Sequence, residues 1–233
     1  WPSMLLTIWG DDERYRQLCR KDRVWVERAI FTDGQPNNVV LANSSRPMVM
    51  DVWHNLVSGA DVPDDLTLAS FSIERDRQAL LPFIRAAQRV AGAPLKLLAS
   101  PWSPPAWMKT TGRMNDGGKL RPDCARAWAR CYVRFIESYE DAGVPIWGVS
   151  VQNEPLATQR WDSCLYTAEE ERDFVRDHLG PELEAAGLGR VKIVIWDHNR
   201  DLMAQRANVV YSDPAAARYV WGTGFHWYGE DCF

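Results

Sequence analysis

The sequence SVQNEPLATQRW, residues 150–161, changes character abruptly. Strand-forming residues lead into Gln152, Asn153 and Glu154, and Pro155 then ends the strand, because proline has no N–H to donate to a β ladder. Asn and Pro are also common turn residues. The stretch therefore allows two interpretations: ordinary turn chemistry, or a strand whose end holds a carboxylic acid out to a substrate.

Strands and helices alternate on both sides of this stretch. The spacing of apolar residues predicts strands at 94–100, 145–152, 191–196 and 223–228, with helices between them. Helix starts are predicted at the capping residues Asp123, Thr167 and Asp213. Because strands that alternate with helices form βαβ units, the sequence predicts a parallel sheet of neighbouring strands with its helices outside.

Three features favour a barrel over a doubly wound open sheet. No GxGxxG motif follows a strand, the loops after the strands are long, and polar or aromatic residues stand at the strand ends, namely Trp102, Glu154, Asp197 and residues 226–228. A (β/α)₈ barrel builds its active site at these ends. Residues 1–93 have room for about two more strands. The expected fold is therefore an α/β, (β/α)₈ TIM barrel that is incomplete, with about strands 2 or 3 to 6 present.

Composition excludes several classes of protein. The 233 residues are 46% hydrophobic and 25% charged, as in ordinary soluble globular proteins. A net charge of −4 gives no basic field for nucleic acid, and no apolar run approaches the roughly 20 residues of a membrane span. The 12 Trp suit a sugar-binding cleft, because an indole packs on the apolar face of a sugar ring, but a Trp-rich core explains them equally well. The oligomeric state is not indicated.

The cysteines and the first residues say little about compartment. Five cysteines without CxxC or CxxH spacing indicate neither a zinc site nor a full disulfide framework. The chain starts at Trp1 without an initiator Met or a signal-peptide pattern, so we expect a piece of a longer protein. Its location stays unknown, and an extracellular or periplasmic one remains open if the full-length protein carries a signal peptide.

A carboxylate at a strand end has a specific use in a barrel. Partial burial at the barrel mouth raises its pKa and lets it act as a general acid near neutral pH. On this interpretation Glu154 is the acid, and the adjacent amide of Asn153 can hydrogen-bond a sugar hydroxyl. Glycoside hydrolysis uses two such carboxylates, one as proton donor and the other as nucleophile or base.

The cluster Asp197, His198 and Asn199 allows a metal site or a catalytic triad as well. No second histidine lies at ligand spacing, which favours a polar cluster that supports the rim of the active site. Neither a metal nor an organic cofactor is implied.

Three separated motifs resemble glycoside hydrolase family 30, in its glucosylceramidase-like (acid β-glucosidase) branch and most closely in bacterial members. They are SPWSPPAWMKT at 100–110, VQNEP at 151–155 and HWY at 226–228. The resemblance makes residues 61–233 the central portion of the catalytic TIM barrel. Residues 1–60 match poorly and have room for early barrel strands.

The resemblance implies roles for particular residues. Glu154 matches the general acid/base and Asn153 the residue that contacts the substrate 2-hydroxyl. Trp102, Tyr228 and Asp51 match substrate-binding residues after the third, sixth and second strands.

Three further residues are given supporting interpretations. Trp161 forms an outer wall of the cleft or only pins its loop, and both alternatives stay open. His226 is read as an orienting residue beside Tyr228, and Asp197 as a support of the site.

The family resemblance also implies an activity. Its enzymes retain anomeric configuration by double displacement, so a β-glucoside such as glucosylceramide is the expected substrate, with β-1,6-glucan and β-xyloside open. The nucleophile glutamate is expected on a seventh strand beyond Phe233, which makes the chain alone inactive. Two other hypotheses remain: a non-catalytic carbohydrate-binding remnant, and a fragment that does not fold alone because its strand edges are exposed.

Overall fold

The computed structural model describes residues 62–78, 80–92 and 95–226, together with the backbone of three strands at 29–32, 36–42 and 49–52. The predicted site residue Tyr228 lies outside these residues. Asp51 lies in the backbone of the third strand, and its side chain is outside the description.

A single seven-stranded sheet organises the fold, in the order β1-β2-β3-β4-β5-β6-β7. The strands are β1 (Ala29–Thr32), β2 (Pro36–Ala42), β3 (Val49–Val52), β4 (Lys96–Ala99), β5 (Gly148–Ser150), β6 (Lys192–His198) and β7 (Val220–Phe225). The first three are antiparallel, and β3 to β7 are parallel neighbours. The predicted parallel order of the last four strands is confirmed. The last strand begins earlier than the predicted residue 223, because Val220 already pairs with Ile193.

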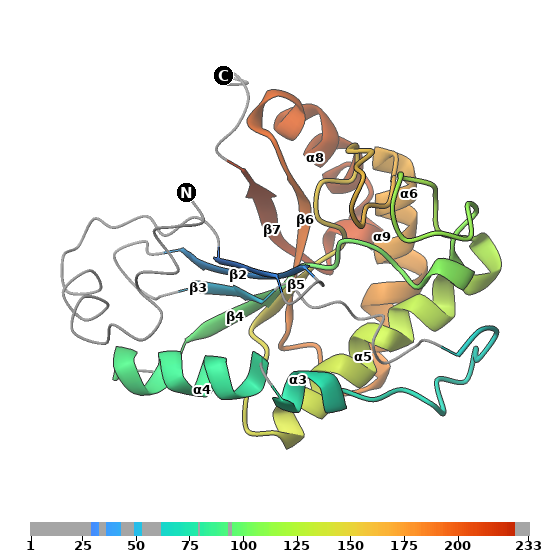
Figure 1. The fold of residues 1–233 in the computed structure, drawn as a ribbon. Helices are drawn as coiled ribbons and strands as arrows, with labels where there is room; N and C mark the ends of the chain where they lie inside the picture. Colours follow the sequence, from blue (N-terminus) through green and yellow to red (C-terminus); the bar gives the residue numbers. More distant parts are fainter. Residues whose placement is uncertain are drawn as a thin grey trace.

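Helices cover one face of the curved sheet, as in the outer layer of a barrel (Figure 1). They are α3 (Glu74–Gln78), α4 (Leu80–Ala91), α5 (Ala125–Asp141), α6 (Ala168–Phe174), α7 (Gly180–Ala185), α8 (Met203–Tyr211) and α9 (Pro214–Ala217). A π-helical turn, η4 (Val175–Leu179), joins α6 to α7, and short 3₁₀ turns are η2 (Ala106–Met108), η3 (Pro122–Cys124) and η5 (Arg200–Leu202). None of the helices in the described part of the chain has both the length and the apolar character of a membrane span.

Two of the three predicted helix caps are confirmed. The Thr167 hydroxyl accepts a hydrogen bond from the Glu170 backbone, and the Glu170 carboxylate accepts one in return, which completes a capping box. Asp213 accepts from the backbone N–H of Ala215. The prediction for Asp123 was wrong, because its carboxylate pairs with the Arg121 guanidinium and leaves the start of α5 without a side-chain cap.

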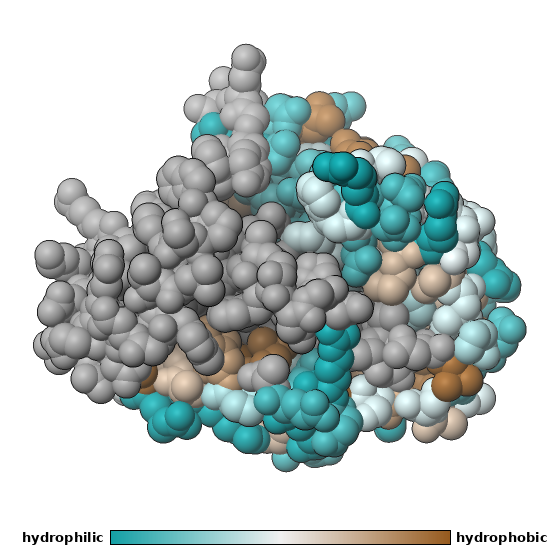
Figure 2. All heavy atoms as spheres, in the orientation of Figure 1, coloured by the Kyte–Doolittle hydropathy of each residue, from teal (hydrophilic) through white to brown (hydrophobic). Residues whose placement is uncertain are grey.

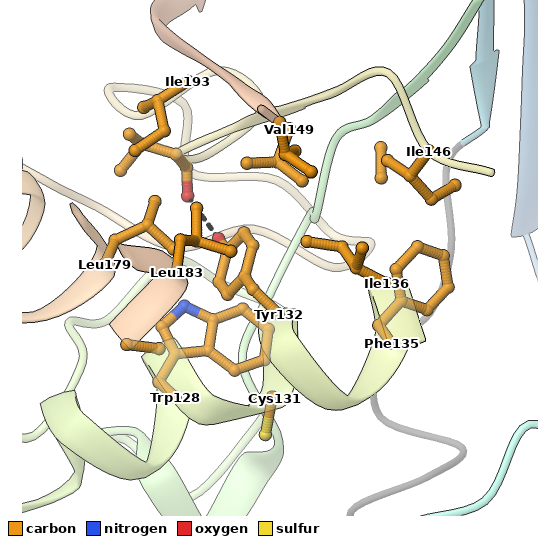
Figure 3. Close-up of a cluster of buried hydrophobic side chains, with 14 of the residues drawn as sticks. Trp128, Cys131, Tyr132, Phe135, Ile136, Ile146, Val149, Leu179, Leu183 and Ile193 are labelled. Carbon is orange, nitrogen blue, oxygen red and sulfur yellow. Dashed lines mark hydrogen bonds between the residues drawn. The ribbon is translucent and has the colours of Figure 1, made fainter. Parts of the chain in front are cut away.

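A large part of the hydrophobic core lies between the sheet and α5. Trp128, Tyr132 and Phe135 of this helix are buried and face Val149 of β5 and Ile193 of β6 (Figure 3). On the face drawn in Figure 2, the described surface over the helices is mainly hydrophilic. The helix layer therefore has the ordinary division between an apolar inner side and a polar outer side.

A polar contact links this core to the end of β5. The Tyr132 hydroxyl donates to the carbonyl oxygen of Val151 at 2.7 Å, the bond drawn as a dashed line in Figure 3. The carbonyl needs such a partner because the strand ladder stops at Ser150, and a buried unpaired carbonyl is costly. The helix thereby fixes the backbone immediately before the residues that open into the candidate site.

Candidate active site

The segments that follow β4, β5 and β6 are tied together through their backbones. The Asn153 N–H donates to the carbonyl of Pro101, and the Glu154 N–H donates to the carbonyl of Asp197, each at 2.9 Å. The Gln152 side-chain amide donates to the carbonyl of Trp102 at 2.8 Å. The three strand ends therefore form one unit at the carboxyl edge of the parallel strands, the place predicted for the site.

Left-handed backbone marks the same place. Glu154 has a φ of 49°, Trp196 of 73° and Asp197 of 46°. Residues other than glycine rarely adopt positive φ, and each such residue costs roughly 1–3 kcal/mol that the surrounding structure must offset. The pairing of β6 with β7 also shifts register between Trp196 and His198. Backbone strain is thus stored where the candidate acid and its neighbours are displayed.

A histidine joins the two carboxylates at these strand ends. His226 Nδ1 lies 3.1 Å from Glu154 Oε1, and His226 Nε2 lies 3.1 Å from Asp197 Oδ1. The side chains of His226 and Glu154 are each 15% exposed. Glu154 therefore lies in contact with the strand-end cluster through His226. Its role as the general acid stays a prediction.

Hydroxyl groups complete the surroundings of Asp197. Ser100 Oγ donates to Asp197 Oδ2 at 2.8 Å, and Ser150 Oγ donates to Ser100 Oγ at the same distance. Burial opposes ionisation of Asp197 and raises its pKa. The hydrogen bond and the charge of His226, together with the hydrogen bonds of Ser150 and Ser100, outweigh burial and hold the pKa of Asp197 below the ordinary value.

The same contacts act in the opposite direction on the imidazole. Burial lowers the pKa of His226, whereas hydrogen bonds to Asp197 and Glu154 raise it, and the result is a pKa of about 9. His226 is therefore a cation at neutral pH and donates one N–H to each carboxylate. This fixes the direction of the Glu154 carboxyl group, which an orienting residue would need to do.

The other predicted residues fall into different situations. Asn153 and Trp102 are both buried beside the strand ends. Trp161 is 46% exposed. In its loop the Ser163 hydroxyl accepts from the backbone N–H groups of Gly117 and Gln159, and both interpretations of Trp161 stay open. The roles of these residues in binding sugar stay predictions.

The loops after β4 and β5 are joined by a buried lysine. Lys109 Nζ donates to the carbonyl oxygens of Met114 at 2.8 Å and Ser163 at 2.5 Å. Burial of the ammonium group lowers the pKa of Lys109. The two loops therefore meet as one rim, which Lys109 holds together.

Sequence reasoning missed the serine partners of Asp197 and a further buried carboxylate, Glu171, which accepts from the backbone N–H of Trp196 at 2.8 Å. A signal for the serines exists, because Ser100 and Ser150 are hydroxyl residues at the ends of otherwise apolar strands. In the described part of the chain, no cluster of three or more His, Cys, Asp or Glu has the arrangement of a metal site. Asp197 is occupied by His226 and the hydroxyl groups.

A family model described as the glycosyl hydrolase family 30 TIM-barrel domain matches residues 38–232. Among curated proteins, "Lysosomal acid glucosylceramidase" of Mus musculus is 40% identical over 178 residues, which cover 72% of this chain and 34% of that protein. "Endo-1,6-beta-D-glucanase" of Neurospora crassa is 30% identical over 170 residues, 71% of this chain and 34% of that protein. The chain spans about a third of the length of the curated relatives it matches.

Solved structures agree. SrfJ from Salmonella typhimurium aligns with a TM-score of 0.69 and 42% identity, over 73% of this chain and 39% of that one. The endo-β1,6-glucanase BT3312 aligns with a TM-score of 0.64 and 31% identity, over 72% of this chain and 39% of that one. The incomplete TIM barrel inferred from the sequence is thus also the fold found by comparison.

Proposed function

The chain belongs to glycosyl hydrolase family 30, and from this premise we propose that it carries the acid/base half of the active site of a retaining β-glycosidase. The proposal depends on one observation: Glu154 stands at the end of β5 with its carboxyl group held by His226. A general acid must reach the glycosidic oxygen from a fixed direction, and the hydrogen bond from His226 fixes the direction of the Glu154 carboxyl group.

In the proposed mechanism Glu154 protonates the leaving oxygen and then removes a proton from the water that releases the sugar. His226, as a cation between two carboxylates, keeps Glu154 in one orientation through both steps. Asn153 binds the substrate 2-hydroxyl, and Trp102, Trp161, Tyr228 and Asp51 line the sugar site.

The second carboxylate of a retaining pair stands about 5 Å from the first. Asp197 is a poor candidate, because one of its oxygens contacts His226 and the other accepts from Ser100. We therefore keep the assignment of the nucleophile to a glutamate on a seventh strand beyond Phe233. Residues 1–233 alone should then bind sugar without hydrolysing it. The alternative hypothesis of a non-catalytic remnant predicts the same behaviour for the complete protein.

A β-glucoside such as glucosylceramide is the proposed substrate. Relatives named as glucosylceramidases, at 36–40% identity, support this choice. β-1,6-Glucan is the second candidate, since relatives and a solved structure with endo-1,6-glucanase names are 29–31% identical. A β-xyloside has weaker support, from a xylanase structure at 27% identity.

The test is Glu154→Gln in the full natural protein. The variant should lose roughly 10²–10⁴-fold in glycosylation rate on a natural β-glucoside, because general acid catalysis contributes about that much. It should lose far less on an activated aryl β-glucoside, whose leaving group needs no proton.

Glu74→Gln, on the exposed surface of α3, is the matched control and should leave both rates unchanged. Equal losses on both substrates would contradict the acid/base assignment. An inactive natural protein that still binds β-glucoside would favour the non-catalytic alternative.

A further inference from the structure

A buried ion pair lies behind the strand ends and joins α6 to α8. Arg206 Nη2 lies 3.3 Å from Glu171 Oε2, with the side chains only 8% and 1% exposed. Taking two charges out of water costs about as much as their attraction returns, so a buried pair is weak evidence for stability. The pair of Glu171 and Arg206 is therefore better explained by what its atoms contact than by its contribution to stability.

The second oxygen of Glu171 is directed at the strained backbone. Oε1 accepts from the Trp196 N–H at 2.8 Å. Trp196 and Asp197 are the two left-handed residues at the end of β6, where the pairing with β7 shifts register. The carboxylate thus satisfies an N–H at the point where the strand pairing is irregular.

Arg206 holds the same residue from another side. Its guanidinium lies 5.2 Å from the centre of the Trp196 ring, and Nη2 also donates to the carbonyl of Tyr166 at 3.0 Å. The Trp196 indole N–H donates to the carbonyl of Asn199 at 2.8 Å. Trp196 is therefore held at its backbone, at its ring face and at its ring edge.

Asp197 comes next in the chain and makes the contacts that define the site. Its carboxylate reaches His226 and Ser100, and its carbonyl accepts from the Glu154 N–H. All these contacts depend on the direction of the backbone that the positive φ angles of Trp196 and Asp197 produce. A change in the conformation of Trp196 would consequently move two supports of Glu154 together.

We propose that Glu171 and Arg206 are positioning residues, which clamp Trp196 so that Asp197 holds His226 and Glu154 in the geometry for proton transfer. The part of this inference that concerns catalysis rests on the proposed function. The part that concerns His226 does not, because it is a statement about the resting structure.

Two double variants separate the hydrogen bond from the charges. Glu171→Gln with Arg206→Met removes both charges but keeps an oxygen for the Trp196 N–H. Glu171→Leu with Arg206→Met removes the acceptor as well and fills the space with apolar atoms, a replacement that folded proteins often tolerate. The readout is an NMR titration of the His226 ring, which faces Asp197 and Glu154 and lies 6.3 Å from the His198 ring.

With Leu and Met, the pKa of His226 should fall from about 9 by roughly one unit or more toward the ordinary 6.5, because Asp197 no longer holds it. With Gln and Met the pKa of His226 should fall by less than with Leu and Met, because the hydrogen bond to the Trp196 N–H remains while the contact of Arg206 with the Trp196 ring is lost. In the full natural protein, the Leu and Met variant should lose about tenfold in kcat on a poor leaving group, less on an activated aryl glycoside, with KM within about twofold.

A folded Leu and Met variant with an unchanged His226 titration overturns the proposal, whatever its activity. If that variant does not fold, Glu171→Met with Arg206→Leu, which also removes the acceptor of the Trp196 N–H, takes its place: a fall in the pKa of His226 of a unit or more supports the clamp, and an unchanged titration overturns it. If the natural protein shows the His226 effect but hydrolyses no β-glycoside, the proposed function fails and the positioning role stands.

Discussion

The carboxyl-terminal ends of β5 and β6 bury different kinds of side chain from the face of these strands that packs against α5. On that face the buried contacts are between apolar and aromatic side chains such as Trp128, Phe135 and Val149. At the strand ends the buried groups include Asp197, Ser100 and Ser150, and three residues have positive φ. The apolar helix layer therefore supplies stability that offsets the backbone strain in the polar cluster.

The largest expected effect tests the stable side of this comparison. Trp128→Ala should reduce the free energy of unfolding by about 3–5 kcal/mol, because it removes a fully buried indole from the core. Trp161→Ala is the matched control, since that indole is nearly half exposed, and should change stability by no more than about 0.5 kcal/mol. Urea denaturation followed by circular dichroism measures both. Similar losses in the two variants would remove the distinction between core and rim.

The next effect concerns the charge at the strand ends. The folded protein holds the His226 proton to a pKa of about 9, whereas an unfolded histidine releases it near 6.5. The stabilisation from protonated His226 is therefore complete below pH 6.5 and is lost as the pH rises to 9. The complete loss should be about 3 kcal/mol.

Chemical denaturation at a series of pH values between 6 and 8 measures the part of this slope that lies below the range in which the buried Cys131 and Cys164 thiols contribute. In His226→Gln the stability should no longer fall over this interval, because the group that binds the extra proton is gone. The assignment to His226 is wrong if the variant keeps the slope of the natural chain.

The smallest effects distinguish the two serines. Ser100→Ala should cost roughly 1–2 kcal/mol, because it removes the hydrogen bond to Asp197 Oδ2 and also the acceptor of the Ser150 hydroxyl. Ser150→Ala removes only the outer bond and should cost about 0.5–1 kcal/mol. Thermal unfolding at pH 6 compares the variants, and the reverse order would mean that the hydroxyl chain does not run from Ser150 to Asp197.

Much of the fold was readable from the sequence because its determinants are local. The periodicity of α5, the capping box at Thr167 and the apolar strand before Glu154 each depend on residues close together in the chain. The parallel order then follows from the alternation of strands and helices. Asp123 was misjudged because a cap depends on where a neighbouring arginine places its side chain.

The candidate site was only partly predictable, for the opposite reason. Ser100, Glu154 and His226 come together from three strand ends. The left-handed conformation of Trp196 and Asp197 occurs without a glycine or asparagine, the residues from which positive φ is usually predicted. Glu171 is one of three consecutive glutamates in the first turn of α6 and resembles an ordinary solvated residue in sequence. Only the packing of α8 against α6 reveals that it is buried.

The reactivity of Lys109 reports whether the two loops of the rim are in contact. Its ammonium group is enclosed by the carbonyl oxygens of Met114 and Ser163, so amine-reactive labels and trypsin should both pass it over while the two loops stay together. Exposed neighbours such as Lys119 offer a reference rate for the same reagents. The labelling of one lysine, followed by mass spectrometry, would thus show when the rim opens, without substrate and without any change to the site.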